Sequence, residues 1–185
     1  TINSQPVSST SSDTLKSLSK ISVTGYVGDK NGTKLSNFNG VVYPTVFDKE
    51  VITTTLANDP APQVLNGSLP FTFAVQKNII YKGKSQVVNG EFSFSFLVPK
   101  DISYNFGKGK ISYYAHNGVD DASGYYDQVI IGGSNPNPLV DNQGPAISLF
   151  MNDEKFVSGG VTNENPKIYA IVSDSSGINT IGTGI

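Results

Sequence analysis

The residues best equipped for chemistry lie in one stretch, HNGVDDASGYYD, which spans residues 116–127. His116, the single histidine, is followed there by Asp120, Asp121 and Asp127, so the stretch could form a calcium site or an acid/base cluster. Calcium needs about six to eight converging oxygen ligands, and this spacing matches no EF-hand loop. We therefore interpret the stretch as a polar loop between two strands; the pattern alone leaves open whether Asp120, Asp121 or Asp127 binds a cation.

A second acidic group, Asp153, Glu154 and Asp174, lies at the ends of the last two predicted strands. These carboxylates could meet at a seam between two domains and share a cation, and the sequence leaves that alternative open as well. Because no ligand pattern of known spacing is present, we assign no metal site and expect no cofactor.

The sequence lacks the residues and motifs on which nucleophilic catalysis usually depends. Cysteine is absent, and no G-x-S-x-G elbow occurs although serine is plentiful. His116 stands at a predicted strand end with no feature that marks it as a base. We therefore predict that these 185 residues contain no catalytic residue.

Two pairs of adjacent tyrosines, Tyr113-Tyr114 and Tyr125-Tyr126, suggest binding instead of catalysis. In a strand, one ring of each pair must point away from the core, where it could stack on a sugar or pack against a partner. We favour the interpretation that the outer rings cover neighbouring side chains. The alternative is a carbohydrate platform on Tyr114, Tyr125 or Tyr126.

The composition favours strands over helices. Hydrophobic residues make up 37% of the chain, and phenylalanine (10) and tyrosine (9) carry much of that apolar mass. Thirteen basic residues, all of them lysine, face 15 acidic ones, so the chain has neither a basic field nor the arginine that reads nucleic acid. No apolar run approaches the roughly 20 residues of a membrane-spanning helix. We expect an all-β protein with no membrane span and no nucleic-acid partner.

Short strand patterns alternate with turn signals along most of the chain. The hairpin dipeptide Asn-Gly occurs at 31–32, 39–40, 66–67, 89–90 and 117–118. Strand patterns occupy residues 20–27, 39–48, 51–56, 70–76, 79–88, 91–98 and 109–116, and later 146–153 and 167–174. Pro44 cannot donate to a ladder, so its strand should lie at an edge or be bulged.

The segment NGEFSFSFLVP, residues 89–99, gives the clearest register. If Asn89-Gly90 is a two-residue turn, a long hairpin follows, with Val88 opposite Glu91, Val87 opposite Phe92, Ser85 opposite Phe94, Gly83 opposite Phe96 and Tyr81 opposite Val98. The three phenylalanines then share a buried face, while Glu91 and the serines between the rings face water. We predict that these rings are structural.

Composition shifts divide the chain into four parts. Residues 1–13, polar and without periodicity, are expected to form a disordered linker. Residues 14–132 are expected to form an immunoglobulin-like β-sandwich, and the Pro/Gly/Asn-rich residues 133–145 a second linker. Residues 146–185 are expected to begin a second, truncated immunoglobulin-like domain, whose strand edges are covered by the first domain or by another copy, or else stay mobile.

Long segments of the chain resemble one known family. GVVYPTVFDKE (40–50), residues 79–118 with the motif VPKDISYNFGKGKISYYA, and residues 142–185 with the motif NENPKIYAIVSDSSGIN carry the likeness. They resemble the region downstream of the catalytic domain in gingipain-like cysteine peptidases that act as sortases of the type IX secretion system. The resemblance covers about residues 14–185.

The resemblance implies a place in a larger surface enzyme. In that family a peptidase domain removes the C-terminal targeting domain of secreted cargo and attaches the cargo to anionic lipopolysaccharide. Its catalytic cysteine and histidine lie ahead of the region matched here, so the resemblance transfers no catalytic role and implies a non-catalytic spacer and docking module. It also implies a location on the extracellular side of the outer membrane, with outer-membrane components of the system and secreted cargo as partners. A carbohydrate-binding or adhesin-type surface module is the alternative.

Overall fold

The computed structural model describes residues 1–7, 14–58, 69–138, 143–174 and 178, and this part of the chain contains strands and no helix. The strands are β1 (Thr14–Ser17), β2 (Lys20–Tyr26), β3 (Gly40–Phe47), β4 (Val51–Thr54), β5 (Thr72–Val75), β6 (Ile79–Lys82), β7 (Ser85–Val88), β8 (Glu91–Leu97), β9 (Gly107–Lys108), β10 (Lys110–His116), β11 (Asp121–Tyr126), β12 (Ile130–Ser134), β13 (Ala146–Met151) and β14 (Ile168–Ser173).

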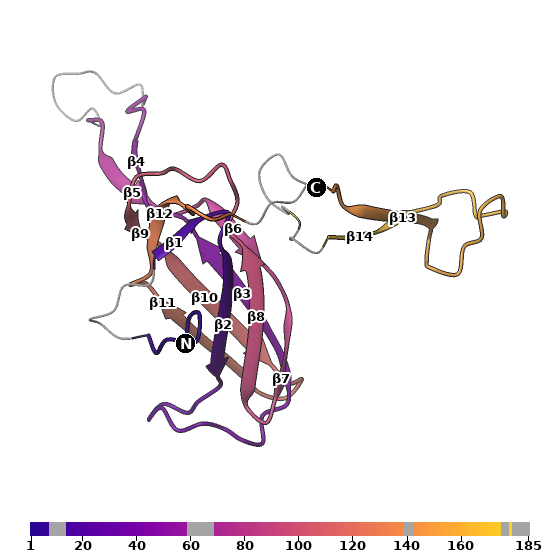
Figure 1. Cartoon of the computed structure of the whole chain (residues 1–185), viewed down its shortest axis with the longest axis horizontal. Helices are drawn as coiled ribbons and strands as arrows, with labels where there is room; N and C mark the ends of the chain where they lie inside the picture. Colours follow the sequence, from indigo (N-terminus) through magenta and orange to yellow (C-terminus); the bar gives the residue numbers. More distant parts are fainter. Residues whose placement is uncertain (8–13, 59–68, 139–142, 175–177, 179–185) are drawn as a thin grey trace.

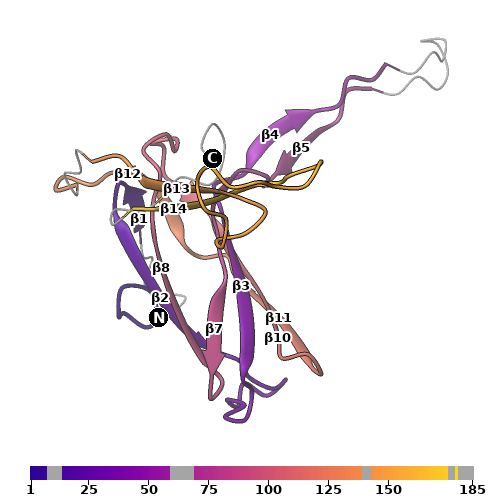
Figure 2. The same cartoon turned by 90° about the vertical axis from the view of Figure 1, so that its right-hand side faces the viewer.

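Most of these strands belong to one curled sheet (Figures 1 and 2). Its order is β11-β10-β3-β7-β8-β2, with β6 also paired to β3. Buried side chains from β2 and β8 meet those from β3 and β10 in a common core that includes Ile21, Val23, Val46, Phe94, Phe96 and Ile111. The two limbs of the sheet therefore face each other, and the predicted all-β, sandwich-like architecture is confirmed.

The turn at Asn89-Gly90 forms as the sequence predicts. Both residues have positive φ angles, 51° and 78°, which is the two-residue turn that matches the twist of a hairpin. Val87 pairs with Phe92 and Val88 with Glu91, as expected. Phe94 and Phe96 are buried while Ser93 and Ser95 are exposed, so the predicted faces of β8 are confirmed.

Beyond that turn, the predicted long hairpin is wrong. The strand pattern at 79–88 is split into β6 and β7, and β6 pairs with β3 instead of β8, with Tyr81 opposite Val46. The ring of Tyr81 stacks on Phe94 at 5.6 Å and on Phe96 at 4.6 Å between centroids. Aromatic side chains thus fill the space between β6 and β8, where the expected ladder would have held the two backbones too close for the rings.

Five rings make up this packing, and we call them the ring cluster: Tyr81, Phe92, Phe94, Phe96 and Tyr113. They come from β6, β8 and β10, and thus join both limbs of the sheet. Gly25 lies opposite Phe92 on β2, and a Cβ added there would meet the Phe92 ring at 2.5 Å. Only glycine leaves room for the ring at that position.

Pro44 lies in a central strand, so the first alternative, an edge strand, is wrong; the irregularity expected as the second alternative occurs as a break in the neighbouring ladder and a register shift between Val46 and Phe47. β3 pairs with β10 on one side and with β7 and then β6 on the other. The Pro44 carbonyl accepts a hydrogen bond from the Gly83 N–H at 3.1 Å, at the break between β6 and β7. Because the N–H and C=O of a residue in an antiparallel strand point to the same side, the donor that Pro44 lacks falls at this break.

The ends of the predicted 14–132 unit meet in a second sheet, of order β1-β12-β9. β1 runs parallel to β12, with Leu15 opposite Ile131, and both side chains are fully buried. β12 extends to Ser134, and the Asn135 N–H donates to the Ser17 carbonyl at 3.1 Å. The start of the predicted linker at 133–145 is therefore part of the folded body; residues 139–142 lie outside the described residues.

The prediction of a disordered linker over residues 1–13 is wrong for residues 1–7. Ile2 is buried at 1% exposure in the core and bridges to Val23. The Asn3 N–H donates to the Ser22 carbonyl at 2.7 Å, and the Thr24 N–H donates to the Thr1 carbonyl at 3.0 Å. Burial of one isoleucine contributes roughly 1.5–3 kcal/mol, which together with this pairing docks the segment. Residues 8–13 lie outside the described residues.

Two hairpins form sheets of their own, β4–β5 and β13–β14. Figure 1 shows both extending away from the curled sheet, and Figure 2 shows this clearly for β4–β5. β13 and β14 occur where the sequence predicts strands, and Ile147 opposite Val172 and Leu149 opposite Ala170 give one apolar face. Ile147 is 61% and Leu149 67% exposed, so the described residues of the first body do not cover this face.

Replacement of Phe96 by alanine tests the ring cluster. Because Phe96 is buried and stacks on Tyr81, the change should lower the free energy of unfolding by about 3–5 kcal/mol. Urea unfolding would measure it, with Ser95→Ala on the solvent face of β8 as the control that changes stability by less than about 0.5 kcal/mol. In a double-mutant cycle with Tyr81→Ala we expect a coupling of about 0.5–1.5 kcal/mol. Equal effects of the two single changes at 95 and 96 would contradict the packing described.

The partly buried Tyr113 side chain should lower the free energy of unfolding at alkaline pH. Burial, with a smaller contribution from the charge of Tyr126, raises the pKa of Tyr113 from 10.0 to about 12. Between pH 10 and about 12 the folded protein therefore keeps a proton that the unfolded chain releases. The stability that depends on protonated Tyr113 is complete below pH 10 and is lost as the pH rises toward about 12. Between these values the free energy of unfolding should fall by up to about 1.4 kcal/mol per pH unit more than in Tyr113→Phe, measured by urea unfolding. Parallel pH profiles for the two proteins would refute the assignment.

Candidate functional site

The structure separates Asp127 from the other polar candidates of the 116–127 stretch. The interpretation as a loop is wrong for residues 121–126, which form β11 and pair with β10. Asp121 lies directly opposite His116, whereas Asp127 follows the far end of β11. At about 3.3 Å per residue, Asp127 lies roughly 20 Å from Asp121, so Asp127 does not join His116, Asp120 and Asp121 in one site.

Asn117 and Asp127 have local partners. The Asn117 side-chain Oδ1 accepts hydrogen bonds from the N–H groups of Val119 at 2.9 Å and Asp120 at 2.7 Å, which shapes the turn at 117–120. The Asp127 carboxylate accepts a hydrogen bond from the Gln128 side chain at 2.7 Å. These contacts are those of turn and surface residues.

The second acidic group is likewise distributed over local contacts. Asp153 Oδ1 accepts a hydrogen bond from the Lys155 N–H at 2.8 Å. Glu154 accepts one from the Tyr169 hydroxyl at 3.1 Å, and this bond, with the carboxylate charge, raises the pKa of Tyr169. Asp174 follows β14.

Within the described ranges, no three histidine, aspartate or glutamate side chains lie close enough together to hold a metal ion. The same ranges hold no helix with the length and apolar character needed to cross a membrane.

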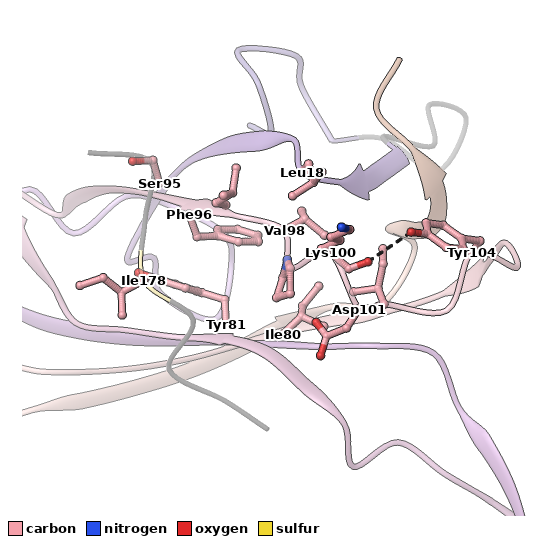
Figure 3. Close-up of a pocket in the computed structure, with 13 residues that line it drawn as sticks. Leu18, Ile80, Tyr81, Ser95, Phe96, Val98, Lys100, Asp101, Tyr104 and Ile178 are labelled. Carbon is pink, nitrogen blue, oxygen red and sulfur yellow. Dashed lines mark hydrogen bonds between the residues drawn. The ribbon is translucent and has the colours of Figure 1, made fainter. Parts of the chain in front are cut away.

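An apolar pocket opens where β6 separates from β8 (Figure 3). Ile80, Tyr81, Phe96, Val98 and Ile102 form its apolar walls, and Ile178 lies beside Tyr81. The Tyr104 hydroxyl donates to the Lys100 carbonyl at 3.5 Å across its rim. Among the residues that line it, Asp101 is the single carboxylate and there is no histidine, so the pocket suits an apolar side chain and not acid/base chemistry.

The outer face of the curled sheet carries a second feature, which we call the three-ring platform: Tyr43, Tyr114 and His116. Tyr43 lies directly opposite Tyr114, and the ring centroids are 6.4 Å apart with an interplanar angle of 29°. His116 lies 5.8 Å from Tyr43 at 12° and 6.0 Å from Tyr114 at 38°. Sequence reasoning noted Tyr114 but missed Tyr43, because only the register of β3 and β10 brings the two together.

A third feature is the hairpin of β4 and β5 with its flanking residues 55–56 and 69–71, which we call the β4–β5 arm. Its side chains are apolar or uncharged polar, and large ones are exposed: Val51 (41%), Ile52 (68%), Leu56 (84%), Leu69 (84%), Phe71 (66%) and Phe73 (38%). Phe71 and Phe73 stack at 6.3 Å. The arm is a two-stranded sheet, so each strand also has an unpaired edge within the described residues.

Comparison with known proteins places the chain. No protein-family model matches it, and no curated protein matches it. Among solved structures, it is similar to the crystal structure of dimeric latent PorU from Porphyromonas gingivalis, with 32% sequence identity and a TM-score of 0.71. The match covers 100% of this chain and 17% of the PorU chain. At this identity and full coverage the likeness extends beyond fold, and the chain is a PorU-like region.

Proposed function

We propose that the chain is a non-catalytic spacer and docking module of a cell-surface sortase. The parent enzyme would be a gingipain-like cysteine peptidase that removes the C-terminal targeting domains of type IX secreted cargo and attaches the cargo to anionic lipopolysaccharide. In this proposal the module lies on the extracellular side of the outer membrane, and the arm binds an outer-membrane component of the secretion system. The likeness to a segment of PorU supports the parentage.

The observation that carries the docking role is the β4–β5 arm. Exposed apolar patches on soluble proteins mark interaction sites, and exposed hydrophobic strand edges are normally covered. The arm has both, and it projects from a body whose other large side chains are mostly packed in the ring cluster and the core (Figure 2). Ile52 and Phe71 lie on opposite faces of the arm, so a partner can contact it from either side.

The spacer role rests on the rigidity of the body. The curled sheet holds together limbs distant in sequence, and β1 and β12 bring the two ends of the unit side by side. Such a unit holds the segments joined to it in a fixed relative orientation. Because cysteine is absent and His116 stands on an exposed sheet face, catalysis is assigned to another part of the parent protein.

Substitution in the arm of the parent protein tests the docking role. Ile52→Ser with Phe71→Ser should reduce co-purification with outer-membrane components of the secretion system at least about tenfold, because apolar anchors dominate such interfaces. Quantitative mass spectrometry of the purified complexes would measure it. Both side chains are exposed, so stability should change by less than about 0.5 kcal/mol.

The matched control is Val88→Ser, which removes an exposed apolar side chain (59% exposed) from the body instead of the arm. It should leave the recovered partners unchanged. Recovery that is unaffected by the arm substitutions, or lost equally with Val88→Ser, would overturn the assignment of docking to the arm.

A further inference from the structure

We propose that the three-ring platform is a binding site for a pyranose saccharide. This inference is independent of the docking role proposed above, because it concerns a different face of the molecule and a different class of ligand. It rests on the arrangement of Tyr43, Tyr114 and His116 and on the charged groups around them.

The platform faces solvent. On β10, Ile111 and Ala115 point into the core, so Tyr114 and His116 point outward, and Tyr114 is 45% exposed. The interplanar angles of 12–38° show that the three rings are roughly parallel, and Tyr43 stacks with both Tyr114 and His116. A pyranose presents an apolar C–H face, and the exposed amphipathic ring of Tyr114 is suited to pack against it while the hydroxyl stays in water.

Polar groups of both signs surround the rings. Asp121 lies opposite His116 on β11, and Lys82 lies opposite Thr45 on β6, next to Tyr43. Together with Asp120, these residues line one shallow depression with the platform. Carboxylates accept hydrogen bonds from sugar hydroxyls, whereas the lysine ammonium donates to hydroxyl and ring oxygens, so the rim can orient a neutral sugar.

The surroundings disfavour other ligands. An aromatic cage for a quaternary ammonium group needs rings that enclose a cation, but Lys84 already places its ammonium 5.9 Å from the Tyr43 ring centroid, and Lys82 adds a second positive charge. A protein partner of the apolar kind fits the uncharged arm better than this rim. The two aspartates oppose a nucleic-acid backbone.

The platform also distinguishes between the exposed tyrosines. Tyr125, at 71% exposure, is the more accessible ring, but it lies opposite Ser112, two positions along the strand from Tyr114. Contiguous rings offer more contact area to a sugar than a single one, so Tyr114 and not Tyr125 is the predicted stacking residue.

Titration of the 185-residue chain with four neutral tetrasaccharides tests the proposal. The probes are cellotetraose, maltotetraose, chitotetraose and mannotetraose, each raised to about 10 mM, which detects a dissociation constant as weak as about 10 mM. We expect at least one of them to give saturable amide chemical-shift changes confined to β3, β10, the turn at 117–120 and the rim residues Lys82 and Asp121. With that tetrasaccharide, Tyr114→Ala should weaken binding about tenfold, and Asp121→Asn should weaken it severalfold.

Two controls make the result decisive. Tyr125→Ala removes an exposed tyrosine outside the platform and should bind within about twofold of the unmodified chain, while Tyr114→Phe keeps the ring and should bind within about threefold. Dispersed amide spectra of each variant would show that it is folded. The proposal is overturned if none of the four tetrasaccharides shifts the platform residues, or if Tyr114→Ala and Tyr125→Ala bind alike.

Discussion

The stacking of Tyr81 on Phe94 and Phe96 is the contact on which the rest of the structure depends. The rings occupy the space between β6 and β8, and a backbone ladder cannot form there at the same time. β6 therefore pairs with β3 while β8 pairs with β2, and the sheet curls so that its two limbs enclose a common core. The break between β6 and β7 follows from this separation, and it is also the place that tolerates Pro44 in a central strand.

The same geometry determines what the outside of the sheet presents. Tyr113 and Tyr114 are neighbours on β10, and alternation sends the first ring into the ring cluster and the second to the solvent face. β3 alternates in the same way, with Val42 and Pro44 inside and Tyr43 outside. Because β3 and β10 are held in register by their ladder, the inner packing fixes the positions of the outer rings as well. The three-ring platform is thus a consequence of the core and needs no loop to position it.

The amino-acid pattern predicts the strands that are half-buried and fails where burial has another origin. β2, β8 and β10 alternate clearly because one face is in the core, and Asn89-Gly90 specifies its turn through local backbone geometry. β1 and β12 are short and contain serine or glycine, and their burial comes from pairing across more than 100 residues, which no local window reveals. Ile2 is a single apolar residue in a polar segment, so periodicity could not identify it as core.

The contact surfaces, too, are only partly visible in the sequence. The exposed phenylalanines of the β4–β5 arm are visible in the sequence as strand residues, but only their lack of an opposing layer makes them a surface. Tyr43 and Tyr114 are 71 positions apart and become neighbours only through the sheet register. Sequence reasoning could therefore suggest an exposed tyrosine but not the site around it, since a site is a property of pairing and not of any one segment.

The two surfaces also differ in the physics by which they would bind. The arm is uncharged, so its association would depend on burial of apolar area and change little with ionic strength. Lysines and aspartates surround the platform. Hydrogen bonds from these charged side chains would orient its ligand, and their strength would depend on the charges nearby. Since they occupy different strands and share no residue, one surface can be occupied without altering the other.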